Sequence, residues 1–159
     1  MTIRNSTLIA NYEATPVVIN DAALYRGVKR VAQGTMELLA GDSTDNDVIM
    51  FAAIPSQATI TSIIIGSDTL GGSCTFNVGL HQTDGTVVDE DYFASLVADA
   101  AAMTELRYEA AAIETTGLKV FEMAGASVDP GDHYYVSATF AATGGTAGTM
   151  SFIIDYVVN

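Results

Sequence analysis

Short alternations of apolar and polar residues, separated by turn residues, follow one another along the chain from about residue 28 onward. In the clearest of them, residues 73–80, every second residue is apolar, which is typical of a half-buried β-strand. Its apolar positions are Cys74, Phe76, Val78 and Leu80. Similar patterns predict strands over residues 28–40, 47–54, 58–66, 104–113, 118–124, 133–141 and 150–158.

The segments between these patterns have strong turn chemistry. Pro55 has no N–H for a strand ladder, Gly71-Gly72 and Asp84-Gly85 favour tight turns, and Asp129–Asp132 reads Asp-Pro-Gly-Asp. Roughly seven to nine short strands with regular turns predict an all-β fold of two packed antiparallel sheets, a jelly-roll-like sandwich.

One interval departs from the period of two and predicts a short crossover helix near residues 90–103. Asp89 is a suitable N-cap, and apolar residues then recur at three- and four-residue spacing. These residues are Phe93, Leu96, Val97 and Ala100. We expect this helix to pack on one face or end of the sheets.

Residues 1–23 differ from the rest of the chain, because their apolar residues are isolated and show no sustained period. This pattern predicts an extended N-terminal arm or a first edge strand, followed by a single sandwich domain over residues 24–159. The arm either lies along its own domain or reaches a neighbouring subunit. Its candidate partner-binding residues are Ile3, Leu8, Ile9, Tyr12 and Val17.

Composition narrows the classes of partner. Apolar residues make up 49% of the 159 residues, charged residues only 16%, and the formal net charge is −13. A surface this acidic disfavours direct binding to nucleic acid and to anionic membranes. The sequence has no apolar run of membrane-spanning length and no secretory signal pattern, so we expect synthesis in the host cytoplasm.

Catalytic motifs are missing from the sequence. It contains no GxSxG, HExxH, CxxC, Walker or GxGxxG pattern, so we expect a protein that is not an enzyme and has no cofactor or small-molecule substrate. By strand alternation, Cys74 belongs to the core and His81 to the solvent side, and His133 is a surface residue at a strand start.

Two groups of carboxylates raise the question of calcium. They are Asp42, Asp45 and Asp47 in one turn, and Asp89, Glu90 and Asp91 in another segment. Neither group matches the twelve-residue loop of helix–loop–helix calcium sites, and clustered aspartates are expected in the turns of an acidic protein. We therefore expect no bound metal.

A recurring motif links the middle of the chain to a known family. The apolar strand ending in Ile54-Pro55 is followed by Ser56 to Ala58, Asp68, Leu70-Gly71, Ser73, Thr75 and Val78-Gly79. With the closing unit from Asp129 onward, residues 30–159 resemble small structural proteins of tailed bacteriophages. The resemblance implies a jelly-roll-like capsid decoration (cement) protein or other minor head structural protein, forming a homotrimer on the capsid surface of the virion. Its implied partners are the major capsid protein and other copies of the chain itself.

Two alternative functions remain open at this point. The first is a carbohydrate- or receptor-binding module of a phage tail fibre or an adhesin, which would need an exposed cluster of aromatic side chains. The candidates for such a cluster are Tyr25, Tyr92, Tyr108 and Tyr135. The second is a small hydrolase on a sandwich scaffold, which the missing catalytic motifs disfavour.

Overall fold

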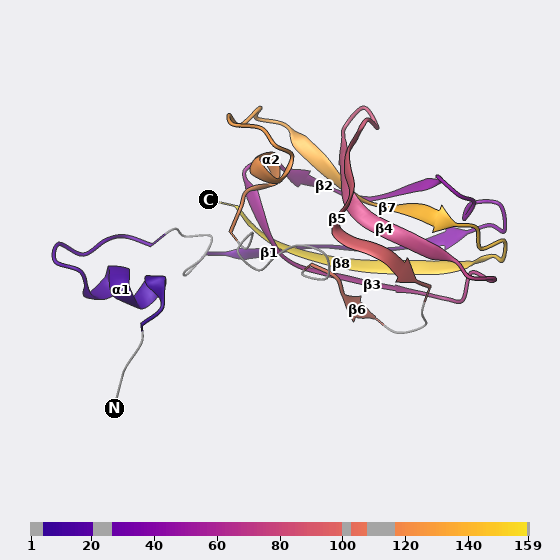
Figure 1. Ribbon diagram of the computed structural model, residues 1–159, viewed down its shortest axis with the longest axis horizontal. Coiled ribbons are helices and arrows are strands. Elements are labelled where there is room, and N and C mark those ends of the chain that lie inside the picture. The colour runs from indigo at the N-terminus through magenta and orange to yellow at the C-terminus, as the bar shows by residue number, and fades with distance from the viewer. Residues whose placement is uncertain (1–4, 21–26, 100–102, 108–116, 159) are drawn as a thin grey trace.

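Two antiparallel four-stranded sheets pack face to face in the computed structural model, which describes residues 5–20, 27–99, 103–107 and 117–158 (Figure 1). The strands are β1 (Lys29–Leu38), β2 (Val48–Pro55), β3 (Ala58–Ser67), β4 (Thr75–Gln82), β5 (Val87–Ala98), β6 (Thr104–Glu105), β7 (His133–Ala142) and β8 (Gly148–Val158). The helices are α1 (Thr7–Glu13) and α2 (Val120–Met123). Neither of them is long and apolar enough to span a membrane.

The order of the strands is that of a jelly roll. One sheet reads β1-β8-β3-β6 and the other β2-β7-β4-β5. With the eight strands lettered B to I, the sheets become BIDG and CHEF, the arrangement that two interleaved Greek keys produce. The prediction of an all-β, two-sheet antiparallel sandwich is therefore confirmed.

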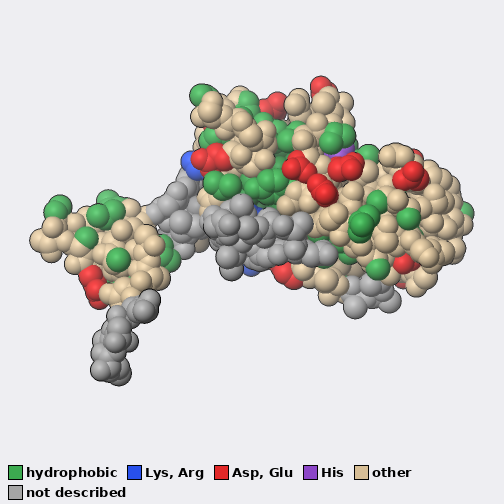
Figure 2. Space-filling model, viewed as in Figure 1, with side chains coloured by type: hydrophobic (Ala, Val, Ile, Leu, Met, Phe, Trp, Pro, Cys, Tyr) green, Lys and Arg blue, Asp and Glu red, His purple; other side chains and the backbone are tan. Residues whose placement is uncertain are grey.

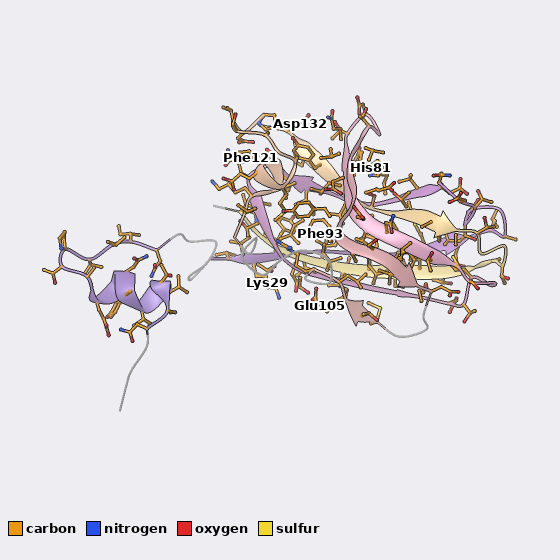
Figure 3. All side chains as sticks on the ribbon, in the orientation of Figure 1. Lys29, His81, Phe93, Glu105, Phe121 and Asp132 are labelled. Carbon is orange, nitrogen blue, oxygen red and sulfur yellow. The ribbon has the colours of Figure 1, made fainter. Side chains whose placement is uncertain are left out.

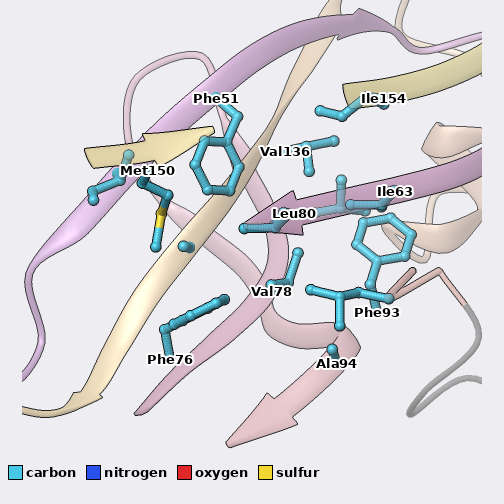
Figure 4. Close-up of a cluster of buried hydrophobic side chains, with 14 of the residues drawn as sticks. Phe51, Ile63, Phe76, Val78, Leu80, Phe93, Ala94, Val136, Met150 and Ile154 are labelled. Atoms are coloured by element: carbon cyan, nitrogen blue, oxygen red, sulfur yellow. The ribbon is translucent and has the colours of Figure 1, made fainter. Parts of the chain in front are cut away.

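The core lies between the two sheets and is built from the alternating apolar positions (Figure 4). The predicted inner face of β4 is confirmed, because Cys74, Phe76, Val78 and Leu80 are all buried. Ile63 on β3 and Ile154 on β8 face them from the other sheet and are opposite each other in the ladder. Burial of each such side chain stabilises the fold by about 1.5–3 kcal/mol.

The predicted helix near residues 90–103 is wrong over its described part, because residues 87–98 form strand β5. β5 pairs with β4, but its register shifts three times, and each shift adds residues to one strand that have no partner on the other. These irregularities break the period of two and mimic helical spacing. Phe93 is buried, whereas Leu96 lies 64% exposed with a φ of 52°.

A side chain from β4 stabilises this irregular strand. The Asn77 Oδ1 atom accepts a hydrogen bond of 2.8 Å from the Leu96 backbone N–H. The backbone of Asp89 and Glu90 passes directly over Gly79, so closely that a Cβ atom on Gly79 would overlap it. β5 therefore covers part of the outer face of β4, which simple alternation would leave exposed to solvent.

Two further predicted strands differ from the structure. The strand predicted over residues 118–124 is replaced by helix α2 at residues 120–123, whose apolar side chains Val120 and Met123 are buried. The Glu122 carboxylate accepts a hydrogen bond of 2.7 Å from the Lys119 N–H, which satisfies a donor at the helix start. Of the strand predicted over residues 104–113, Thr104 and Glu105 pair with β3, while residues 108–116 lie outside the described chain.

Candidate interaction surface

The N-terminal segment contains a short helix where the sequence predicts an extended arm or an edge strand. Helix α1 begins after Ser6, whose side chain accepts a hydrogen bond of 3.4 Å from the Ile9 N–H. Ser6 is thus an N-cap, and this is the sequence signal that could have revealed the helix. After α1 the chain reverses direction at residues 14–16, where the Thr15–Pro16 peptide bond is cis.

Hydrogen bonds close residues 5–20 into a hairpin-like unit, which we call the arm. The Asn11 side-chain amide donates to Asn20 Oδ1 at 2.8 Å, and the Asn20 amide donates to the Leu8 carbonyl at 3.0 Å. The Val18 N–H donates to the Asn11 carbonyl at 3.1 Å. The segment after Pro16 is therefore fastened to α1, and the arm has a defined shape.

The arm exposes its apolar side chains, and α1 buries none of its residues (Figure 2). Of the residues predicted to bind a partner, Ile9, Tyr12 and Val17 are exposed and Leu8 is half-buried, while Ile3 lies outside the described residues. Val18 and Ile19 extend this surface, and Ile19 is 92% exposed. The sequence signal for these two residues is the apolar run Val17–Ile19, which does not alternate with polar residues as a half-buried strand does. Several exposed apolar side chains on one short unit are typical of an interaction site.

A second surface lies between the two sheets on the side of β1 and β2. These strands are the outer strands of their sheets, so within the described chain each has one edge without a ladder partner. A groove of about 530 Å³ opens between the end of β1 and the start of β2. We call it the seam groove, and it is lined by apolar Met36, Leu38, Val48, Ile49 and Met50 and by the carboxylates of Glu37, Asp42 and Asp47.

The aspartates near this groove stabilise the turn that connects β1 to β2. The Asp42 carboxylate accepts a hydrogen bond from the Leu39 N–H at 2.8 Å, and the Asp47 carboxylate accepts one from the Thr44 N–H at 2.9 Å. Hydrogen bonds from the Thr44 hydroxyl and then the Thr44 N–H lower the pKa of Asp47. Over the described ranges, no three acidic, His or Cys side chains come close enough to hold a metal ion.

His81 is buried, which corrects the prediction that it faces solvent (Figure 3). Alternation placed it correctly on the face of β4 opposite Leu80, but β5 covers part of that face. Its side chain is 1% exposed, and its Nδ1 lies 2.7 Å from the Ser137 hydroxyl. That hydroxyl donates in turn to the Gly79 carbonyl at 3.4 Å. His133 is exposed at the start of β7, as expected.

The burial of His81 predicts a loss of stability in weak acid. Burial lowers the pKa of His81 below its ordinary value of 6.5, and the neighbouring Glu90 carboxylate opposes this shift. The unfolded chain therefore binds a proton at a higher pH than the folded protein does. The contribution of His81 to stability is fully present above pH 6.5 and is lost as the pH falls towards its folded pKa.

Urea denaturation at a series of pH values between about 7.5 and 5 measures this loss, which is at most about 1.4 kcal/mol per pH unit for one proton. The variant His81→Gln is expected to flatten the dependence of unfolding free energy on pH in this range. His133→Gln, which changes an exposed histidine, is the matched control and should keep the wild-type slope. Equal slopes for wild type and His81→Gln would show that His81 does not titrate as its burial predicts.

The described tyrosines outside the arm do not form the exposed aromatic cluster that a sugar-binding site would need. Tyr92 is half-buried and packs edge-on against Phe93 with ring centroids 5.2 Å apart, and Tyr135 is also half-buried. Tyr25 and Tyr108 lie outside the described residues. The only large exposed aromatic among the described residues is Tyr12, which belongs to the arm.

Comparison with known proteins identifies the fold. No protein-family model matches the chain, and no curated protein sequence is significantly similar to it. The structure is similar to a chain in the cyanophage Pam1 capsid asymmetric unit, with 19% identity over 84% of this chain and 86% of that chain and a TM-score of 0.57. It is also similar to a chain in the capsid of Ralstonia phage GP4, with 18% identity over 89% of each chain and a TM-score of 0.61. At these identities the similarity shows a shared fold.

Proposed function

We propose that this protein is a virion structural protein that decorates or cements the outer surface of a phage capsid. It binds neighbouring major capsid subunits and acts as a homotrimer. The proposed role is one of binding and assembly, and it requires no cofactor and no small-molecule substrate. The fold shared with chains from two phage capsids supports the general class, and the surfaces of this chain support the particular role.

The observation that carries the proposal is the arm, a preformed unit with exposed apolar side chains. A unit as short as residues 5–20 cannot build a core of its own, so its apolar surface remains in contact with water until a partner covers it. Its internal hydrogen bonds hold the shape before binding, which lowers the entropy lost when the partner arrives. The arm is therefore the surface with which the protein reaches a neighbouring subunit.

The energetics of a single arm favour a multimer. Burying the arm's exposed apolar side chains, Ile9, Tyr12 and Val17–Ile19, contributes roughly 5–10 kcal/mol, because most of them are already in part covered. Association itself costs roughly 4–15 kcal/mol of free energy, because the partners lose translational and rotational freedom. One arm alone therefore binds weakly. Three copies that bind as one particle raise the overall affinity through effective concentration. This arithmetic favours binding by several linked copies, and the proposed number is three.

The charge of the chain suits the outer surface of a particle filled with DNA. A net charge of −13 repels the phosphate backbone and keeps the protein soluble at high surface density. Acidic side chains are visible over the sandwich in Figure 2. The same charge favours basic surfaces as partners.

Sedimentation with capsid shells tests the proposal. Shells assembled from the major capsid protein of the source phage are mixed with increasing amounts of this protein and pelleted through a sucrose cushion. We expect binding that saturates at a fixed ratio to the capsid protein and weakens as salt is raised. Binding to a glycan array with no binding to shells would contradict the proposal and favour the carbohydrate-binding alternative.

A further inference from the structure

We infer that strand β1 of one copy pairs antiparallel with β1 of a second copy, about a two-fold axis that passes at Gln33. The pairing joins the two β1-β8-β3-β6 sheets edge to edge into one continuous sheet. The inference goes beyond the proposed function, because a two-fold contact joins one trimer to another and cannot build a trimer. It depends on the regular edge of β1, the charges along that strand, and the register in which two copies match.

The outer strands of the two sheets differ in how well they resist pairing with another chain. Within the described chain, the sheets end in β1 and β6 and in β2 and β5. β6 has only two residues, β2 has an irregular register and ends in Pro55, and β5 has three register shifts. Short length, proline and bulges are the usual devices that keep an open edge from recruiting a further strand.

Strand β1 has none of these devices along its described length. Its ten residues pair with β8 without a register shift from Lys29 to Leu38. It contains no proline, and residues 31–36 carry no charge. Its other edge has no ladder partner among the described strands. The backbone N–H and C=O groups of that edge are therefore open to a strand from another chain.

The side chains of β1 alternate between the core and the outer face of the sheet. Ala32 and Met36 pack against the core. The outer side chains are exposed, and they are those of Lys29, Val31, Gln33, Thr35 and Glu37. Neighbouring residues of β8 hold several of them in place. The Thr35 hydroxyl, for example, lies 2.9 Å from the Ser151 hydroxyl.

Symmetry restricts the registers that two β1 strands can adopt. Residues opposite each other in an antiparallel ladder point to the same face of the sheet. Across a two-fold axis the outer faces of both copies lie on one side, so each odd-numbered residue lies opposite another odd-numbered residue. The longest overlaps that satisfy this condition are residues 29–37, centred on Gln33, and residues 30–38, centred on Gly34.

Charge selects the register centred on Gln33. In this register Lys29 of each copy lies opposite Glu37 of the other, which gives two pairs of opposite charge. In the register centred on Gly34, Glu37 would instead lie opposite the apolar Val31. Opposite charges on facing strands thus distinguish the two alternatives.

Both charged side chains are available to a second copy. Lys29 contacts Asp155 at 2.5 Å, yet its side chain remains 58% exposed (Figure 3). One oxygen of the Glu37 carboxylate accepts a hydrogen bond of 3.2 Å from the Thr149 hydroxyl, and a carboxylate has room for further donors.

The net charge of β1 also favours contact between copies at this strand. With Lys29, Arg30 and Glu37, β1 carries +1 in a chain that carries −13. Two copies repel each other over most of their surfaces, so they meet with least repulsion where the charge is not negative.

A two-fold contact has a consequence for a decorated shell. A closed shell with three-fold and two-fold axes places a two-fold axis between neighbouring trimers, and paired β1 strands would connect those trimers into a net. A single pair of strands is a small contact. Trimers held side by side on a shell would supply the effective concentration that such a contact needs.

Disulfide trapping in the full-length protein tests the register. Gln33→Cys sets two thiols opposite each other with Cβ atoms about 4.5–5.5 Å apart, so mild oxidation should give a covalent dimer. Thr35→Cys is the matched control, because two copies of this position lie about 13 Å apart in the same register. It should form no dimer alone and should cross-link when mixed with Val31→Cys. The native Cys74 is 1% exposed and takes no part.

Charged substitutions at Gln33 test the same contact by affinity. Gln33→Lys and Gln33→Glu each set like charges opposite each other and should weaken the two-fold association by about 10-fold or more. The equimolar mixture of the two variants should restore it, because opposite charges then meet. Analytical ultracentrifugation measures the association of one trimer with the next, or of two monomers where no trimer forms. Val128→Asp adds one negative charge at an exposed position outside β1 and should associate as the wild type does.

The outcomes separate this contact from the other possibilities. Absence of a Gln33→Cys dimer, an equal yield of dimer from Thr35→Cys alone, or a mixture of charge variants that stays dissociated would each overturn the inference. A cross-link from Gln33→Cys to the major capsid protein on shells, with none between copies, would also overturn it and assign the edge to a capsid strand. Shell binding is measured separately, so this contact can fail while the proposed function stands.

Discussion

Deletion of residues 1–20 is expected to weaken binding to capsid shells by about 100-fold or more, because it removes the exposed apolar side chains with which we propose that the protein reaches the neighbouring subunit. Helix α1 buries none of its residues, so the sandwich should keep its fold and its thermal midpoint. The two effects together would separate a binding function of the arm from a structural one. Sedimentation of the truncated and full-length proteins with shells, at matched concentration and salt, measures the change.

The point variant Ile19→Asp is the finer version of this experiment and should reproduce most of the loss, since Ile19 is 92% exposed and supports no part of the fold. Val128→Asp should bind shells as the wild type does. If the truncated protein bound shells with undiminished affinity, the arm would not be the surface that reaches the neighbouring subunit.

The second large effect concerns the sandwich itself. Gly79→Ala is expected to destabilise the protein by about 3 kcal/mol or to prevent folding, because overpacking against rigid atoms forces the backbone to shift. A Cβ at this position would overlap the backbone atoms of Asp89 and Glu90, which cannot rotate away as a flexible side chain can. The midpoint of urea denaturation, at an unchanged slope, measures the difference.

Gly41→Ala is the matched control for this prediction. A methyl group at position 41 would meet no heavy atom within 4 Å, and the φ of this residue lies outside the left-handed region. Its unfolding free energy should stay within about 0.5 kcal/mol of the wild type. Equal stability of the Gly79 and Gly41 variants would mean that β5 does not cover the outer face of β4.

The alternation of apolar residues predicts most of the sandwich because strands with one buried face follow it closely. The strands predicted over residues 133–141 and 150–158 are found as β7 and β8. The order of the strands within the sheets could not be read from the sequence, since it depends on pairings between residues far apart in the chain. β1, for example, pairs with β8 in a register that joins Lys29 to Val157.

The errors have specific physical causes. The irregular register of β5 gives Phe93, Leu96 and Val97 a spacing that also fits a helix, and only the partner strand β4 decides between the two. The burial of His81 follows from the path of β5 over the neighbouring Gly79, which no local pattern encodes. Residues 118–124 have a strand-like composition, but burial of Val120 and Met123 on one side favours a single turn of helix.

The candidate site could be predicted in part. Isolated apolar residues indicate that the N-terminal segment differs from the sandwich, and Ile9, Tyr12 and Val17 are exposed there. The sequence does not predict the closed shape of the arm, because that shape depends on hydrogen bonds between Asn11 and Asn20. The seam groove could not be predicted either, since its shape depends on how the two sheets pack and on where that packing places the end of β1 relative to the start of β2.

The copy number of this protein in intact virions tests the central proposal most directly. Particles from a lysate of the source phage are banded on a density gradient, and the ratio of this protein to the major capsid protein is determined by quantitative mass spectrometry. We predict a fixed, high ratio that stays with the heads when the tails are detached. Absence from the particles, or a few copies that fractionate with the tails, would contradict a capsid decoration role.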